Sequence, residues 1–335
     1  MPGYDSLRIA GRLAALFAGV LWLQACSQLP ERPADLVLDN GYSGGSALAT
    51  SPDSSLVAAG ALNGMLRVWH LEDGVVYRAW GGHAGPVTGL AFLGTGRLLT
   101  AGYDGRLATW TADGRLLRRL DTGKPITAFA IRPDRERFAT GHVDGSVRLW
   151  RADMTLLNAW TGLHQGGVRS VAFEAGSDRL ASSGDDRAVF LWSATAPPRR
   201  LDDPPSDARV LQFEPGGGAL LGAGWFRLFR WDLDSGALVT LPTDHGGIIN
   251  DIEFMADGRL ASISRQTDSA VLLLDSVSGR TLDRLQRHAL CGTAVAPSPD
   301  GRYLATTSDD ASVRIWRLHR APGGSSARES GQPAE

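Results

Sequence analysis

From residue 35 onward, short apolar runs alternate with turn residues along the chain. One stretch shows the pattern clearly, with runs at Val87 to Phe92, Arg97 to Ala101 and Arg106 to Trp110 and with glycine and aspartate between them. Runs of this length bounded by turn residues predict antiparallel strands joined by tight turns. A further run follows each such group, as at Leu116 to Leu120. The predicted unit is therefore a four-stranded antiparallel sheet.

The unit repeats seven times, in steps of 39 to 43 residues. The third run of each unit ends at Trp69, Trp110, Trp150, Trp192, Trp231, Leu274 and Trp316. Six places earlier stand Asn63, Asp104, Asp144, Asp186, Trp225, Asp268 and Asp310. Five units carry a hydroxyl four places before that, at Thr100, Thr140, Ser182, Ser264 and Thr306, and four carry an upstream histidine, at His83, His164, His245 and His288. A period near 40 residues with four residue types in phase indicates a repeat architecture.

The first strand of the chain is expected to close the array. Only six outer runs lie between the seven endings, so one sheet lacks its fourth strand. The segment Asp35 to Asp39 can supply that strand beside the last repeat. A ring closed in this way leaves no open sheet edge between its first and last units.

The pattern resembles the WD-repeat family, whose repeats carry Gly-His and Trp-Asp dipeptides. The chain keeps Gly82-His83 and Trp231-Asp232, with Leu274-Asp275 as a partial match. The resemblance implies an all-β fold, a single seven-bladed β-propeller over residues 35–319. It also implies a hydrogen-bonded tetrad within a blade, complete in three sets: His83, Thr100, Asp104 and Trp110; His164, Ser182, Asp186 and Trp192; and His288, Thr306, Asp310 and Trp316.

The remaining blades carry incomplete sets. The sixth has His245, Ser264 and Asp268 but lacks the indole, and the third lacks the histidine. Blades one and five lack most of the set, so we expect them to be the least stable. His70 and His142 stand alone and are interpreted as surface or turn residues.

The first 25 residues predict a secretion signal. Arg8 and Arg12 precede the apolar run Leu13 to Leu23, which is too short for a comfortable membrane span. Leu23 to Cys26 resembles the lipobox of bacterial lipoproteins, although Gln24 departs from the small or branched residue usual there. An ordinary cleaved signal or an uncleaved anchor is the alternative.

That second resemblance implies removal of residues 1–25 and lipidation of Cys26, with a spacer to residue 34. Ser27 is not the aspartate that retains such proteins at the inner membrane, which favours the outer membrane facing the periplasm. Lipidation would leave Cys291 without an intramolecular disulfide partner. Residues 320–335, rich in Gly, Ser, Ala and Pro, predict a disordered tail.

Composition and spacing argue against catalysis, metal binding and nucleic-acid binding. The serine, histidine and aspartate recur in phase over several units, whereas a catalytic triad is built once. No two histidines or cysteines stand at metal-ligand spacing. The net charge is -2 without a basic block. No catalytic residue, metal or cofactor is expected.

Function is therefore expected at the loops around the central channel. In the family, the residue before the turn aspartate often faces that ring. Tyr103 is the best aromatic anchor among these positions, and Asp185 and Asp309 offer charge for a basic partner. Trp225, within the fifth turn, is either a core residue or an exposed contact.

The function predicted is a non-catalytic protein-interaction scaffold, a monomeric propeller held in the bacterial envelope by its lipid and binding one or more unidentified envelope proteins. One alternative is an enzyme or small-ligand binder that uses the central channel. The other resembles the propeller lipoprotein of the outer-membrane assembly machinery.

Overall fold

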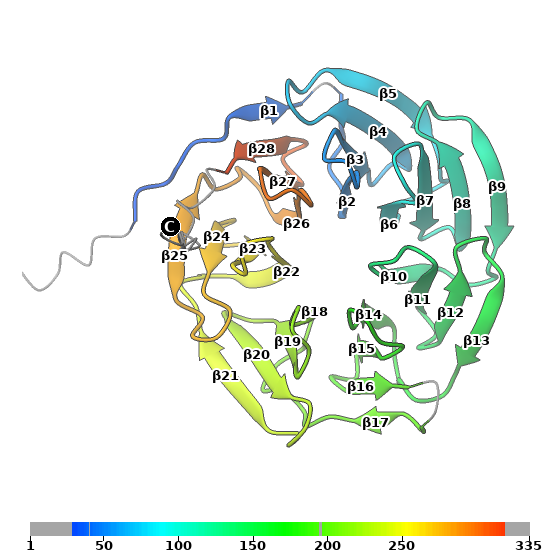
Figure 1. The fold of residues 1–335 in the computed structure, drawn as a ribbon, viewed down its shortest axis with the longest axis vertical. Helices are drawn as coiled ribbons and strands as arrows, with labels where there is room; N and C mark the ends of the chain where they lie inside the picture. Colours follow the sequence, from blue (N-terminus) through cyan, green and yellow to red (C-terminus); the bar gives the residue numbers. More distant parts are fainter. Residues whose placement is uncertain (1–28, 40, 194–195, 319–335) are drawn as a thin grey trace, which may run out of the picture. The chain divides into compact units, whose positions relative to one another are not determined.

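Seven sheets surround a central channel in the computed structural model, which describes residues 29–39, 41–193 and 196–318 (Figure 1). The chain divides into two compact units, Met1–Glu31 and Arg32–Glu335, and the fold described here is that of the second. Each sheet is antiparallel and has four strands. The predicted all-β, seven-bladed propeller is confirmed. In the described part of the chain no helix is long and apolar enough to cross a bilayer.

In blades 1 to 6 the strands follow one another in chain order from the channel outward (Figure 1). Blades 1 and 2 consist of β2 (Ala47–Thr50), β3 (Leu56–Gly60), β4 (Met65–His70) and β5 (Val76–Gly81), then β6 (Val87–Phe92), β7 (Arg97–Gly102), β8 (Arg106–Thr111) and β9 (Leu116–Asp121). Blades 3 and 4 consist of β10 (Ile126–Ile131), β11 (Arg137–His142), β12 (Val147–Arg151) and β13 (Leu156–Trp160), then β14 (Val168–Phe173), β15 (Leu180–Gly184), β16 (Val189–Trp192) and β17 (Arg199–Arg200).

Blades 5 and 6 consist of β18 (Val210–Phe213), β19 (Ala219–Ala223), β20 (Arg227–Asp232) and β21 (Leu238–Pro242), then β22 (Ile248–Phe254), β23 (Leu260–Arg265), β24 (Val271–Leu274) and β25 (Thr281–Leu285). Blade 7 consists of β26 (Gly292–Pro297), β27 (Tyr303–Ser308), β28 (Val313–Arg317) and β1 (Leu36–Leu38).

Blade 7 is completed by the strand from the start of the chain, as predicted. β1 pairs antiparallel with β28, with Leu36 opposite Ile315 and Leu38 opposite Val313. The Leu38 side chain also reaches the turn that holds Gly74 in blade 1, where a Cβ on the glycine would come within 2.4 Å of it. β1 therefore joins blade 7 through backbone hydrogen bonds and blade 1 through packing.

The hydrophobic core is divided among the seven interfaces between neighbouring blades. Each buried cluster combines residues of two adjacent blades, such as Leu66 of blade 1 with Trp110 of blade 2. The last or next-to-last residue of each third strand packs in the cluster shared with the preceding blade. These residues are Trp69, Trp110, Trp150, Trp192, Trp231, Leu274 and Trp316. The phase of the sequence repeat therefore follows from a repeated packing position.

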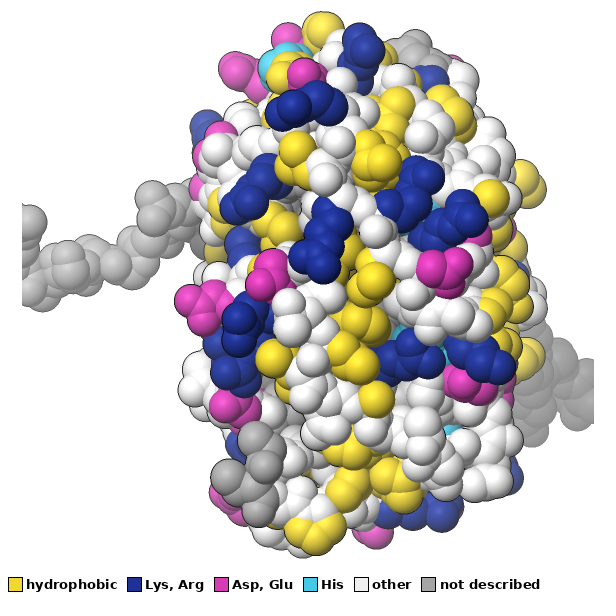
Figure 2. All heavy atoms as spheres, turned by 90° about the vertical axis from the view of Figure 1, so that its right-hand side faces the viewer, with side chains coloured by type: hydrophobic (Ala, Val, Ile, Leu, Met, Phe, Trp, Pro, Cys, Tyr) yellow, Lys and Arg dark blue, Asp and Glu magenta, His cyan; other side chains and the backbone are white. Residues whose placement is uncertain are grey.

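The outer strands form the circumference of the ring. Figure 2 shows hydrophobic and basic side chains mixed on the side where β9 lies. On β9, Leu116 and Leu117 are 43% exposed and two exposed arginines follow them. Charged side chains on an exposed edge discourage pairing with another sheet.

Closure can be tested with two neighbouring residues of β1. Leu38 is 5% exposed and Val37 is 54% exposed. We expect Leu38→Ala to lower the free energy of unfolding by about 2–5 kcal/mol, because it removes buried methyl groups at the seam. Val37→Ala should change it by less than about 1 kcal/mol. Urea unfolding followed by circular dichroism measures both, and equal losses would contradict closure by packing of β1.

Candidate functional site

Blades 2 and 4 hold a histidine, a hydroxyl, an aspartate and a tryptophan in one hydrogen-bonded chain. In blade 2, His83 Nδ1 lies 3.0 Å from Asp104 Oδ1, and its Nε2 lies 2.8 Å from Thr100 Oγ1. The Trp110 indole N–H donates to the same hydroxyl oxygen at 3.0 Å. The corresponding distances in blade 4 are 3.1, 2.8 and 2.9 Å, through His164, Asp186, Ser182 and Trp192. These hydrogen bonds link the second and third strands of the blade to the segment that connects it with the preceding blade.

Blade 7 departs from its predicted set at the tryptophan. His288 contacts Asp310 and Thr306 at 3.0 and 2.8 Å. The Trp316 indole instead donates to the Arg32 carbonyl at 3.3 Å. Arg32 is held beside the outer strand of blade 6 by backbone hydrogen bonds and so brings a carbonyl to this indole. The prediction that Trp316 bonds to Thr306 is corrected accordingly.

Blade 3 replaces its missing histidine with one from its own strand. His142 is fully buried, and its Nε2 lies 2.9 Å from Thr140 Oγ1, which also accepts the Trp150 indole N–H at 2.9 Å. Residues two apart on a strand point to the same side, which places His142 beside Thr140. The interpretation of His142 as a surface or turn residue is therefore wrong. Burial lowers its pKa to about 4, so the ring is neutral at neutral pH.

In blade 6 a different serine contacts the histidine. His245 Nε2 lies 2.8 Å from Ser262 Oγ, whereas Ser264 donates to Asp268 in the turn. Hydroxyl and indole are ten residues apart in blade 2, but Ser262 and Leu274 are twelve apart. The hairpin of blade 6 is longer by two residues, so counting back from Leu274 selected Ser264 in error.

In blades 1 and 5 no side-chain hydroxyl of the described residues accepts the indole N–H of the tryptophan on the third strand. The Trp69 indole nitrogen is buried and has no hydrogen-bond partner in the described part of the chain. The Trp69 ring packs against the Tyr42 ring, with centroids 6.0 Å apart. The Trp231 indole donates to the Asp202 carbonyl at 2.9 Å, next to the outer strand of blade 4. Whether these blades are the least stable stays a prediction.

The hydroxyl groups at the centre of these hydrogen-bonded sets are closed to solvent. Thr100, Ser182 and Thr306 are fully buried. Burial lowers the pKa of His83, although Asp104 opposes the shift. For Asp104, burial raises the pKa, but hydrogen bonds from the Ala84 N–H and from His83 outweigh it, and the net pKa is lowered. A neutral histidine beside an ionised aspartate suits a fixed hydrogen bond.

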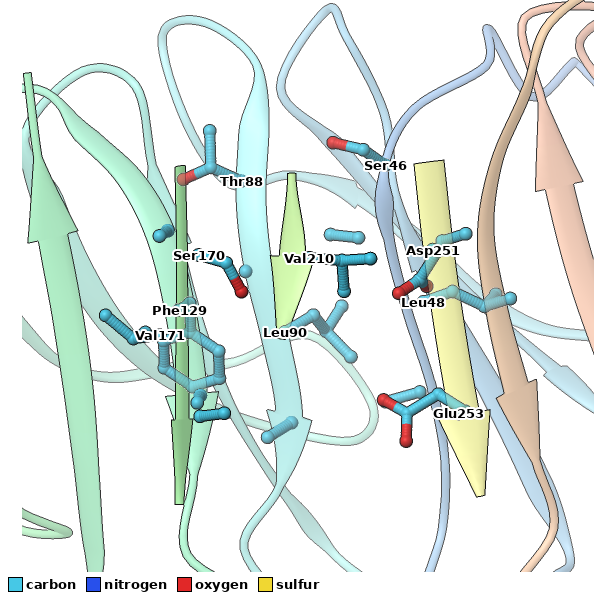
Figure 3. A pocket seen from close by; sticks show the side chains of 18 of the residues that line it. Ser46, Leu48, Thr88, Leu90, Phe129, Ser170, Val171, Val210, Asp251 and Glu253 are labelled. Carbon is cyan, nitrogen blue, oxygen red and sulfur yellow. The ribbon is translucent and has the colours of Figure 1, made fainter. Parts of the chain in front are cut away.

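The central channel is a cavity of about 1010 Å³ lined mainly by the first strands of the blades. Figure 3 shows Asp251 and Glu253 of β22 pointing into it, across from apolar side chains such as Leu90 and Phe129. Asp251 accepts backbone N–H groups of Val295 and Ile252, both at 2.9 Å. Burial raises the pKa of Asp251 to about 7, and burial together with the Asp251 charge raises that of Glu253. Among the described residues no group of three or more His, Cys, Asp or Glu could hold a metal ion.

The predicted partner-binding residues meet at one mouth of the channel. Tyr103, Asp185 and Asp309 all line it and come from turns between second and third strands. Tyr103 is 47% exposed. Asp185 is already paired with the Arg169 guanidinium, at 2.5 Å, which reduces the charge that it offers to a basic partner. Trp225 is 44% exposed, so its position is that of an exposed contact and not of a core residue.

Three arginines at the same mouth were missed by sequence reasoning. Arg169, Arg209 and Arg265 line the cavity from blades 4, 5 and 6. The available signal was the spacing of Arg169 and Arg209, which are one repeat apart. Arg265 lies in the lengthened hairpin of blade 6, outside the repeat phase.

Comparison with known proteins follows the repeat. A profile of the family described as WD domain, G-beta repeat, matches residues 40–70, 74–111, 114–151, 160–193 and 279–317, just over half of the chain. Protein hir1 of Schizosaccharomyces pombe is 27% identical over 214 residues, which are 59% of this chain and 21% of that protein. Transducin beta-like protein 3 of Rattus norvegicus is 26% identical over 301 residues, 81% of this chain and 37% of that protein. Echinoderm microtubule-associated protein-like 1 of Homo sapiens is 24% identical over 270 residues, which are 77% of this chain and 32% of that protein. The chain thus spans well under half the length of these relatives.

The relatives contradict the predicted location at a bacterial outer membrane. They are eukaryotic proteins, from fungi and mammals. Beyond a basic start and an apolar run, the prediction depended on Ser27 and on the motif Leu23 to Cys26, in which Gln24 already departs from the pattern. So short a motif arises readily by chance. Cys26 lies outside the described residues. Because the predicted location is contradicted, the prediction of envelope proteins as partners loses its support.

Removing one hydroxyl tests the tetrad. We expect Thr100→Val, a nearly isosteric change, to lower the free energy of unfolding by about 1–3 kcal/mol, because the buried Trp110 and His83 groups lose their partner. The exposed Thr95→Val should stay within about 0.5 kcal/mol of the wild type. Urea titration at pH 7 gives both values, and a neutral Thr100→Val would show that packing alone holds blade 2.

His142 should make stability depend on pH. Folding lowers its pKa from 6.5 to about 4, so the unfolded chain binds more protons between these values. The free energy of unfolding therefore falls as pH drops through this window and is unaffected above it. Between pH 7 and pH 4 the wild type should lose about 3 kcal/mol more than His142→Gln.

The matched control for this measurement is His70→Gln, at an exposed histidine of β4. It should keep the wild-type pH dependence. If both variants follow the wild type, His142 is not the group responsible.

Proposed function

Because the chain belongs to the WD domain, G-beta repeat family, we propose that it is a non-catalytic scaffold that holds partner proteins at one mouth of its channel. The observation that carries the proposal is a set of large apolar side chains exposed on the turns around that mouth. They are between 42% and 48% exposed: Leu62, Tyr103, Val143, Trp225 and Phe226. We call this set, with the turns that carry it, the rim.

The rim is suited to protein recognition. Aromatic residues fixed on tight turns present apolar area that is already ordered, so little conformational entropy is lost when a partner binds. Trp225 and Phe226 stand together, with ring centroids 5.8 Å apart. One relative is named as microtubule-associated, which is consistent with protein partners in this group of proteins.

A small-ligand site inside the channel is the second candidate. Asp251 and Glu253 favour it, because perturbed carboxyl groups facing a cavity are typical of functional sites. The two functions use different residues, at the rim and deeper in the channel.

Crosslinking in the source cells followed by purification of the tagged full chain distinguishes the two candidates. For the scaffold, we expect Tyr103→Ala and Trp225→Ala to reduce partner recovery at least about tenfold, since each removes an anchor worth about 2 kcal/mol. Asp251→Asn should leave recovery unchanged. Tyr77→Ala is the matched control, because Tyr77 is 44% exposed on the outer strand β5. Recovery that is insensitive to the rim but lost with Asp251→Asn would favour the channel ligand.

A further inference from the structure

A cationic cluster lies at the channel mouth on blades 4, 5 and 6. Arg169 and Arg209 occupy equivalent positions near the start of the inner strands of blades 4 and 5. Arg169 directly precedes Ser170, which is opposite Ser183 of β15, and Arg209 directly precedes Val210, which is opposite Ala223 of β19. Arg265 ends β23 and is opposite Ile248. All three line the same cavity. Adjacent blades therefore direct three guanidinium groups to one part of the mouth.

Among the described residues the three arginines of the cluster form one ion pair with a carboxylate. Arg169 Nε pairs with Asp185. The Nε atoms of Arg209 and Arg265 are buried and have no hydrogen-bond partner among the described residues. Burial lowers the pKa of Arg209, the charges of Arg169 and Arg265 lower it further, and Asp207 and Asp185 oppose the shift. Buried guanidinium N–H groups without acceptors cost free energy, which an oxyanion bound between them would offset.

The turn that carries Trp225 and Phe226 lies next to the segments that carry two of the arginines. Trp225 bridges to Ile248, the residue opposite Arg265, and its backbone N–H lies 3.4 Å from Ser206 Oγ in the connection that leads to Arg209. Phe226 bonds through its N–H to the Gly247 carbonyl. Both aromatic side chains are 44% exposed. The turn that carries these two exposed aromatic residues thus lies next to the segments that carry Arg209 and Arg265.

Deeper in the channel the titratable side chains are acids and not bases. Asp251 and Glu253 lie on β22, and within the described residues neither forms an ion pair with the three arginines. An anion is thus attracted to the mouth and gains nothing by moving further in.

We propose that Arg169, Arg209 and Arg265 bind a carboxylate or phosphate group carried by a partner peptide, and that Trp225 and Phe226 contact an apolar residue beside it. The inference rests on the proposed scaffold function and names the chemistry of its partner. Guanidinium groups suit this ligand because their planar N–H pairs match two oxygens of a carboxylate or phosphate.

The first arm of the test uses inorganic sulfate, with chloride at equal ionic strength as reference, and follows the melting temperature of the full chain. The wild type should show a saturable rise on top of the general stabilisation by sulfate. Arg209→Met and Arg265→Met should each weaken the saturable part about tenfold, because each removes a charge-assisted hydrogen bond. Arg97→Met, at an exposed arginine on the opposite face, should retain it. Identical sulfate curves for all four proteins would overturn the site.

The second arm uses three fluorescein-labelled peptides, Gly-Leu-X-Trp-Leu-Gly, in which X is glutamate, phosphoserine or glutamine. Fluorescence anisotropy should give the two anionic peptides at least about tenfold tighter binding than the glutamine peptide, and this advantage should disappear in Arg209→Met. Tighter binding of the phosphoserine peptide would identify phosphate as the preferred source. Equal binding of all three would overturn the peptide assignment and leave an adventitious ion only.

Partner recovery separates this site from the scaffold itself. If Tyr103→Ala and Trp225→Ala abolish recovery but Arg209→Met does not, the scaffold stands and the anion site is wrong. If sulfate binds through the arginines but Tyr103→Ala and Trp225→Ala leave partner recovery unchanged, the proposed scaffold function is wrong.

Discussion

Every sheet in this protein has two apolar faces, and each face is buried only by a neighbouring blade. The seven buried clusters each join two blades, and the clusters at both sides of blade 1 must be filled for it to be stable. An open row of sheets would expose one apolar face at each end. The ring therefore has to close, and the short strand β1 at the seam supplies that closure.

The same constraint explains why the indole recurs and why its hydrogen bond varies. Packing against the preceding blade requires a large side chain at the end of each third strand, but it does not specify where the indole N–H points. In blades 2, 3 and 4 a buried hydroxyl accepts it. In blades 5 and 7 a backbone carbonyl beside the preceding blade does so. Leu274 keeps the apolar contact without any donor.

Closure also makes the channel mouth a rigid platform. Turns that are about 40 residues apart in sequence become neighbours at fixed positions, so side chains of three blades can act on one group. The exposed aromatic residues and the arginines have no role in the tetrads or in the interblade clusters. Their chemistry is therefore free to serve recognition, whereas the buried histidines, hydroxyls and aspartates are committed to the fold.

The sequence by itself determined the number of blades, their order and the closing strand, because in-phase apolar and turn positions report backbone periodicity directly. It also identified the two tetrads of blades 2 and 4. It did not reveal His142 as a substitute, Ser262 as the partner of His245 or Arg32 as the acceptor for Trp316. Those contacts depend on side-chain direction and on the length of one hairpin, which spacing along the chain does not report. Only the tertiary structure brought Arg169, Arg209 and Arg265 together, because a lengthened turn and the curvature of the ring decide which side chains converge at the channel.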